Sequence, residues 1–337
     1  MPDAKIRWGI LGTAKIARET LCPAIMKSTH GSFAGVASRK LDRAVEFAAP
    51  YPNAKPFGSY DEMLADPEID AIYIPLPNTD HVAWTLNCLE AGKHVLCEKP
   101  IAMQADEIDS LIEARDRTGM LVAEAFMVTH HPQWYRVRDW ISAGHIGELR
   151  HVQGVFTYFN DDPKNIRNQA ALGGGALPDI GVYPCVTTRF VTGAEPVNIR
   201  SNITWNDGVD LSARVWADFD TFTMDFYVSM RMALRQNMVF HGTDGVLTVH
   251  TPFNPPSYGA AKIEIRKPNG DCMSETFSAA DQYVNQFDNF HSTILNWSEY
   301  QCPLEFSKGN QRMIDMIFAG EVLEDNDSDP ELNPDLP

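Results

Sequence analysis

The stretch IRWGILGTAKIA, residues 6–17, decides the fold. An apolar run ends at a glycine turn and an amphipathic segment follows, so the pattern predicts a strand, a tight turn and a helix. This is the order of the dinucleotide-binding turn, although Ala14 and Ala17 stand where two of its glycines are usual. Amides at the start of such a helix point at phosphate oxygens. The predicted phosphate-binding residues are therefore Gly12, Thr13, Ala14, Lys15 and Ile16, the alternative being a tight turn without a ligand.

Strand and helix patterns continue to alternate up to about residue 126. We predict strands over 6–12, 32–38, 70–76, 94–99 and 121–126, and helices over 15–27, 41–49, 80–90 and 105–118. Parallel neighbours need crossover helices, so this alternation predicts an α/β fold with a doubly wound parallel sheet covered on both faces. We assign residues 1–127 to this dinucleotide-binding Rossmann domain.

The pattern changes after residue 127 and predicts a second domain. A helix over 134–143 precedes strands separated mostly by short turns, over 149–159, 197–205, 211–219, 222–230 and 245–250, and helices over 283–297 and 311–323. Such an order predicts an α+β domain with a large, mostly antiparallel open sheet. We assign residues 128–325 to substrate binding and oligomerisation, and residues 326–337 to an acidic tail.

Composition excludes several classes of function. The 337 residues carry 28 Lys and Arg against 45 Asp and Glu, a net charge of −17, which disfavours nucleic acid and anionic lipid as partners. No apolar run reaches the roughly 18 residues that span a bilayer. The six cysteines form no CxxC pair and have no closely spaced histidine, so we expect no metal site and reduced thiols in a cytoplasmic protein.

The end of the second predicted strand bears on the choice of cofactor. NAD-binding domains place a carboxylate there for the ribose hydroxyls, whereas this chain has Ser38 and Arg39. A hydroxyl and a guanidinium suit a ribose phosphate, so we expect NADP rather than NAD. Two alternatives stay open: Arg39 is a solvated residue at the start of a helix, or Asp42 reaches the ribose.

Two further motifs place charged groups near the predicted crevice. Glu98-Lys99-Pro100 follows an apolar strand, and ligands of doubly wound sheets bind outside the carboxyl ends of the strands. In the second domain, three glycines (173–175) precede Asp179 and Tyr183, which are four residues apart and share one face of a helix. Proton transfer by Tyr183 near neutral pH needs a cation such as Lys99 to lower its pKa. The alternatives are a solvated lysine, a carboxylate that caps a turn and a core tyrosine.

Together, GxxGTAxIA (9–17), EKP (98–100), EAFM (124–127), HPQ (131–133) and GGGALxDIGxY (173–183) resemble the Gfo/Idh/MocA oxidoreductase family over nearly the whole chain. With a tyrosine at position 183, the chain resembles the branch that contains glucose–fructose oxidoreductase, xylose dehydrogenases and dimeric dihydrodiol dehydrogenase. This branch mostly uses NADP. The resemblance implies that Lys99 is the catalytic lysine, Tyr183 the acid/base and Asp179 the group that positions substrate hydroxyls. It also implies that nicotinamide and its ribose are lined by Leu76, Pro77, Asn78, His81 and Glu98, with weaker assignments of cofactor contacts to Arg167 and Tyr283.

The activity implied by this resemblance is reversible hydride transfer between NADP and a CH–OH carbon of a sugar or polyol, for example an aldose such as D-xylose or D-glucose, or a trans-dihydrodiol. Family members form dimers or tetramers through the open sheet, and the alternation in residues 222–230 is compatible with such packing. We expect specificity to reside in loops over 160–171 and 230–236. The alternatives are an NADP-binding regulator without turnover and a glycosidase that keeps NAD bound.

Overall fold

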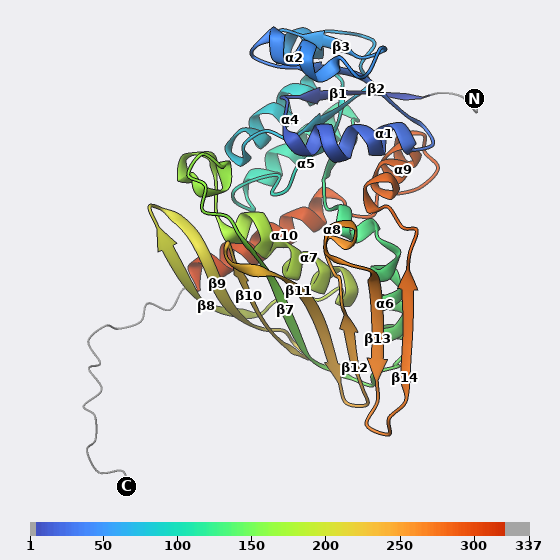
Figure 1. Cartoon of the computed structure of the whole chain (residues 1–337), viewed down its shortest axis with the longest axis vertical. Helices are drawn as coiled ribbons and strands as arrows, with labels where there is room; N and C mark the ends of the chain where they lie inside the picture. Colours follow the sequence, from blue (N-terminus) through green and yellow to red (C-terminus); the bar gives the residue numbers. More distant parts are fainter. Residues whose placement is uncertain (1–4, 321–337) are drawn as a thin grey trace.

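Six parallel strands form the first sheet in the computed structural model, which describes residues 5–320. The strands of this sheet lie at one end of the molecule in Figure 1. Their order is β3-β2-β1-β4-β5-β6, the strand order of a doubly wound nucleotide-binding sheet. The strands are β1 (Ile6–Leu11), β2 (Gly31–Ala37), β3 (Lys55–Phe57), β4 (Ala71–Ile74), β5 (His94–Cys97) and β6 (Val122–Glu124). The order reverses between β1 and β4, which places a ligand crevice at their carboxyl ends. The predicted α/β architecture is confirmed.

Helices cover both faces of this sheet, which explains why its central strands are apolar throughout. All four residues of β4 are buried, as expected for a strand with helices above and below it. The connecting segments are a π-helical turn η1 (Ala17–Leu21), α1 (Cys22–Lys27), α2 (Leu41–Ala48), α3 (Tyr60–Leu64), η2 (Asn78–Asp80), α4 (His81–Glu90) and α5 (Glu107–Thr118). The sequence patterns missed β3 and α3, because elements of three and five residues are too short to show a period.

Eight strands form the second sheet, in the order β14-β13-β12-β11-β7-β10-β9-β8. Only β7 and β10 run parallel, so the predicted mostly antiparallel sheet is confirmed. The strands are β7 (Leu149–Phe159), β8 (Asn198–Asn206), β9 (Val209–Asp218), β10 (Thr223–Ser229), β11 (Arg231–Gly242), β12 (Val246–Val249), β13 (Ala261–Arg266) and β14 (Cys272–Phe277).

Two expectations for this sheet are wrong. The loop predicted over 230–236 lies mainly in β11. The first residues of this strand are mostly exposed and lack the alternation of a half-buried strand. A register shift also interrupts the pairing of β11 with β7 between Arg231 and Arg235. The apolar residues of β10 are Met224, Phe226 and Val228, and they are buried, so they do not form an outer packing face.

Longer helices and short helical segments complete the described fold. The longer helices are α6 (Pro132–Ser142), α7 (Val182–Thr192), α9 (Gln282–Ile294) and α10 (Leu304–Ala319). The short segments are η3 (Met127–His130), η4 (Ile166–Asn168), η5 (Ala170–Leu172), η6 (Leu177–Gly181) and α8 (Pro255–Tyr258). Helices α7 and α10 lie between the sheets in Figure 1, and α10 packs on α5 as well as on β8. Helix α9 packs on β2, with the rings of Trp8 and Phe287 4.9 Å apart. Helix α10, which also contacts β6, therefore joins the two sheets.

The C-terminal predictions fall partly outside the described residues. The last described helix begins seven residues before the predicted start at Gln311, because α10 starts at Leu304. Residues 321–323 of that predicted helix and the tail over 326–337 are not described. The boundary between the two domains stays a prediction. Within residues 5–320, no helix is long and apolar enough to cross a bilayer.

Candidate active site

A cleft of about 1060 Å³ opens between the carboxyl ends of the parallel strands and the second domain. This slightly exceeds the roughly 300–1,000 Å³ of ligand pockets, as expected for a site that holds two molecules. All predicted site residues except His81 line it: Gly12, Thr13, Ala14, Lys15, Ile16, Ser38, Arg39, Leu76, Pro77, Asn78, Glu98, Lys99, Arg167, Asp179, Tyr183 and Tyr283. The fold therefore brings together motifs that lie up to 271 residues apart.

The turn after β1 has the backbone conformation of a phosphate-binding turn. Gly12 has a φ of +87°, which favours glycine, and a Cβ there would approach Leu76 Cδ2 to 3.2 Å. The chain then enters helical structure at Lys15, so its first amides lack acceptors within the helix. These amides are available to an anion at the cleft.

Three cations surround the end of β2. Arg39, Lys40 and Arg43 line the cleft, and within residues 5–320 their side chains make no hydrogen bond or ion pair. Ser38 is buried and accepts a hydrogen bond from the Lys40 amide at 3.2 Å. Asp42, the alternative ribose ligand, does not line the cleft, and its carboxylate accepts from the Arg43 amide. These residues fit a phosphorylated ribose better than a free diol.

The loops after β4 and β5 form the floor of the cleft. Glu98 accepts a hydrogen bond from the Tyr73 hydroxyl. His81, predicted to line the nicotinamide, instead lies behind the cleft and is fully buried. Its ring nitrogens are 2.7 Å from the carbonyl oxygen of Pro100 and 2.9 Å from that of Leu76, and a neutral ring donates to one of these two oxygens. Burial lowers the pKa of His81, which keeps the ring neutral.

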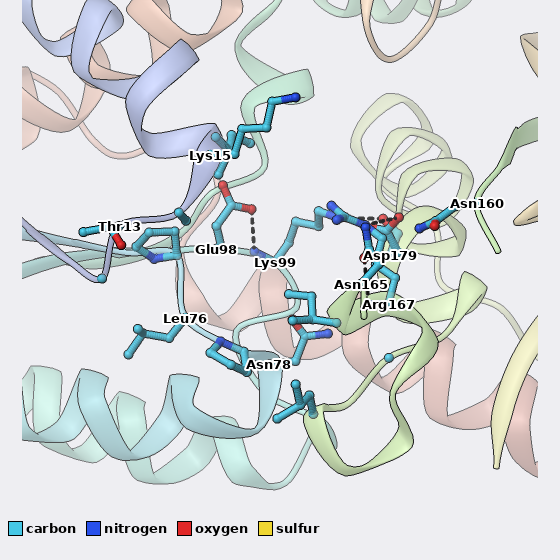
Figure 2. A pocket seen from close by; sticks show the side chains of 18 of the residues that line it. Thr13, Lys15, Leu76, Asn78, Glu98, Lys99, Asn160, Asn165, Arg167 and Asp179 are labelled. Atoms are coloured by element: carbon cyan, nitrogen blue, oxygen red, sulfur yellow. Dashed lines mark hydrogen bonds and ion pairs between the residues drawn. The ribbon is translucent and has the colours of Figure 1, made fainter. Parts of the chain in front are cut away.

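Asp179 is the centre of the charged cluster in Figure 2. Lys99 Nζ lies 3.0 Å from Asp179 Oδ1 and donates to the Asp179 carbonyl oxygen at 2.6 Å. Arg167 Nε is 2.8 Å from Oδ2, and the Tyr158 hydroxyl donates to the same oxygen at 2.6 Å. Burial alone would raise the pKa of Asp179, but the charges of Lys99 and Arg167 outweigh burial and hold it well below its usual range. Asp179 is therefore a carboxylate that fixes two cations.

The pKa of Tyr183 is shifted in the direction opposite to the expected one. Lys99 Nζ stands 5.3 Å from the centre of the Tyr183 ring, while the hydroxyl is 3.6 Å from Met127 Sδ. Burial raises the pKa of Tyr183 well above its ordinary value, and Tyr283 and Glu98 add to this shift. The expectation that Lys99 lowers this pKa is not met, because the ammonium group is paired with Asp179. Tyr183 is a protonated phenol in the cleft wall.

The glycines at 173–175 allow three separate segments of the chain to approach one turn. A Cβ on the first would come within 3.0 Å of Asn78 Cβ, and Asn78 Nδ2 donates to the carbonyl oxygen of that glycine at 2.8 Å. A Cβ on the second would lie 2.5 Å from the Arg167 carbonyl oxygen, and one on the third would overlap the Asp210 carboxylate. The π-helical segment η6 follows and carries Asp179, and π-helical turns are frequent at functional sites.

The sequence patterns missed several lining residues, of which Tyr158 and Arg43 have the clearest roles. Arg43 follows Arg39 by four residues, a spacing that could have revealed it. Tyr158 lies in β7, and its hydrogen bond to Asp179 depends on tertiary structure, so no local signal exists. The others include Tyr60, Phe156, Phe159 and Asn254, whereas Asn160 and Asn165 belong to the loop over 160–171 that was predicted to set specificity. Across the described part of the chain, no group of three or more metal-ligating side chains could hold a metal ion.

Comparison with known proteins gives the same assignment. Residues 6–126 match the oxidoreductase family with an NAD-binding Rossmann fold, and residues 134–248 match the GFO/IDH/MocA C-terminal domain. An uncharacterized oxidoreductase of Rhizobium meliloti is 42% identical over 93% of this chain and 96% of its own. D-xylose 1-dehydrogenase (NADP(+)) 2 of Haloferax volcanii is 31% identical over 92% and 96%.

Solved structures agree with these sequence matches. A 3-ketoreductase from Actinomadura kijaniata in complex with NADP and TDP-benzene has a TM-score of 0.87 and 30% identity, over 94% of this chain and 98% of that chain. These matches confirm the predicted resemblance. The chain belongs to the Gfo/Idh/MocA family of oxidoreductases with an NAD-binding Rossmann fold.

Proposed function

We propose that this oxidoreductase uses NADP to transfer a hydride to or from a CH–OH carbon of an uncharged sugar or polyol. The observation that carries the proposal is the cluster in which Lys99, Asp179 and Tyr183 meet at the carboxyl end of β5, in the same cleft as the phosphate-binding turn. Relatives named as a D-xylose dehydrogenase and a trans-1,2-dihydrobenzene-1,2-diol dehydrogenase support this class of substrate.

The preference for NADP rests on the end of β2. Arg39, Lys40 and Arg43 provide three unpaired cations, and the carboxylate of Asp42 is turned to a backbone amide. Guanidinium groups bind phosphate through two parallel hydrogen bonds. The relative from Haloferax volcanii is named for NADP, and the ketoreductase structure contains it. NAD lacks the phosphate that these cations would hold.

NADP, when bound, supplies the hydride acceptor or donor; the residues of the chain orient the substrate and move its proton. An ammonium group has three hydrogen-bond donors, and Lys99 uses two of them on Asp179. The third can hold the substrate oxygen and stabilise the negative charge that develops on it. Tyr183, kept protonated by burial, donates the proton when a carbonyl is reduced. In the oxidative direction the phenol must first lose its own proton before it can accept that of the alcohol.

The distribution of charge in the cleft separates two substrate classes. Among the described lining residues, the cations not paired with Asp179 lie at the nucleotide end, whereas Lys99 and Arg167 are both bound to Asp179. A nucleoside diphosphate sugar would find no unpaired cation among the described lining residues of the substrate half. Aromatic walls such as Phe156 and Tyr158 suit an uncharged ring. The candidate substrates are therefore aldoses such as D-xylose or D-glucose, and trans-dihydrodiols.

We also propose a cytoplasmic homodimer or homotetramer that associates through the outer face of the second sheet. Trp216 points outward from β9, because its neighbours Val215 and Ala217 are buried, and it is 44% exposed. Size-exclusion chromatography with light scattering measures the oligomer size.

The test of the proposed activity is nicotinamide absorbance with NADP and, separately, with NAD. The substrates are D-xylose, D-glucose, other aldoses, inositols, an aromatic trans-dihydrodiol and a dTDP-sugar. We expect turnover with NADP and one uncharged class. Tight binding of NADP without turnover in either direction would instead identify a regulator, and turnover of the dTDP-sugar alone would reject the charge argument.

A further inference from the structure

A buried carboxylate lies directly behind the charged cluster without entering the cleft. Asp210 is the second residue of β9, is 2% exposed and is not among the cleft-lining residues. A buried carboxylate needs partners, because an unpaired one is costly to bury. Its partners are backbone amides of the segment that carries Asp179.

Asp210 caps the start of this helical segment from another strand. Its Oδ2 accepts a hydrogen bond from the Leu177 amide at 2.6 Å, and the Ala176 amide also donates to the carboxylate. The first amides of a helix have no acceptor within the helix, and a side-chain oxygen at this place fixes the first turn. Such caps usually come from the preceding residue, whereas this one comes from 33 residues further along the chain.

The third glycine of the Gly-rich turn is required for this contact, because a side chain there would displace the Asp210 carboxylate. Gly175 has a φ of +145°, and a Cβ there would overlap Asp210 Oδ1. The Asp179 amide in turn donates to the Gly175 carbonyl oxygen at 3.2 Å. The carboxylate, the glycine and Asp179 therefore form one continuous chain of contacts.

We propose that Asp210 is a positioning residue that sets where Asp179, and through it Lys99, stands in the cleft. The inference rests on the proposed function for its catalytic consequence, but the placement of Lys99 has its own readout. Asp210 does not touch the cleft, so it acts only through the segment that it caps. The charged group that faces it is Asp179, whose own charge is held by Lys99 and Arg167. Asp210 thus fixes the backbone, and the two cations fix the carboxylate.

The experiment compares Asp210→Ala and Asp210→Asn with a matched control, Asp218→Asn. Asparagine keeps one acceptor oxygen, whereas alanine keeps none. Asp218 is an exposed carboxylate at the other end of β9. For each protein, kcat and the Kd for NADP are measured below its unfolding transition, and the rate at which Lys99 reacts with an amine-labelling reagent is measured by mass spectrometry, with Lys164 as an internal reference.

We expect Asp210→Ala to lower kcat about 100-fold, the effect of misplacing a reacting group by about 1 Å, and to leave the Kd for NADP within about twofold of its original value. Labelling of Lys99 should rise while that of Lys164 stays constant, and Asp210→Asn should restore part of both values. Unchanged labelling of Lys99 overturns the proposal, as does a loss of kcat matched by an equal loss of NADP affinity. If the unaltered protein shows no turnover, the proposed function fails while the labelling result still decides this inference.

Discussion

Lys99→Ala is the most informative single substitution in the cleft. The Lys99 side chain is 10% exposed, and its ammonium group binds the carboxylate and the carbonyl oxygen of Asp179. The substitution removes the one remaining donor that faces the substrate. Asp179 keeps Arg167 and Tyr158 as partners, so the carboxylate is not left without a counter-charge.

The magnitude follows from the loss of one charged donor whose side chain is 10% exposed. Removing one donor to a developing oxyanion costs about 100- to 1000-fold in kcat, or roughly 2.7–4 kcal/mol. The phosphate-binding turn and the cations after β2 lie elsewhere in the cleft, so the Kd for NADP should change by less than about twofold, which is roughly 0.4 kcal/mol.

Steady-state nicotinamide absorbance gives kcat, and fluorescence titration gives the Kd for NADP. Lys164→Ala is the matched control, because Lys164 is exposed in the neighbouring loop and does not line the cleft. It should leave both values unchanged. A Lys99→Ala protein with undiminished kcat would refute the assigned role, and so would one whose entire loss is explained by weaker NADP binding.

Three other predictions concern the cofactor, the cluster and pH. Arg39→Ala should raise the KM for NADP about tenfold, since a charged hydrogen bond contributes roughly 1.5 kcal/mol, while the KM for NAD stays constant. Asp179→Asn should lower the free energy of unfolding by about 3 kcal/mol in a denaturant titration, because two cations lose their counter-charge. Burial raises the pKa of Glu124 from 4.5 to about 7, so the folded protein holds a proton that the unfolded chain releases in this window. Stability should therefore fall as pH rises from about 4.5 to about 7, by up to roughly 3 kcal/mol, and Glu124→Gln should flatten this part of the profile.

For each of these three predictions, one result would contradict it. Equal effects of Arg39→Ala on NADP and NAD would mean that the guanidinium does not bind the ribose phosphate. An Asp179→Asn protein as stable as the original would show that Lys99 and Arg167 find other partners. A pH profile of Tm that Glu124→Gln leaves unaltered would assign the dependence to another group, and the buried Asp210, whose pKa burial also raises to about 7, is the first to examine.

The sequence predicted the first domain well because its signals are local. A glycine turn between an apolar strand and a helix, and the absence of a carboxylate after Ala37, can be recognised without tertiary contacts. The patterns missed the opening part of β11, because its first residues are mostly exposed and lack alternation. They also misplaced His81, since a histidine behind a cleft and one in its wall have the same sequence context.

Only part of the charged cluster could be predicted from local sequence patterns. Spacing placed Asp179 and Tyr183 on one face, and the structure brings both to the cleft. The pairing of Lys99 with Asp179, rather than with the Tyr183 hydroxyl, depends on how two distant segments pack. Tyr158 and Asp210 reach the same segment from separate strands, so neither contact is visible in the sequence.

Transfer of deuterium tests the central claim most directly. The protein is incubated with NADP and an aldose or trans-dihydrodiol that carries deuterium on the carbon to be oxidised, and the reduced nicotinamide is analysed by mass spectrometry. We expect one deuterium in NADPH, with far less in the Lys99→Ala protein. Tight NADP binding with no labelled NADPH from any uncharged substrate, and no labelled product in the reductive direction, would contradict it.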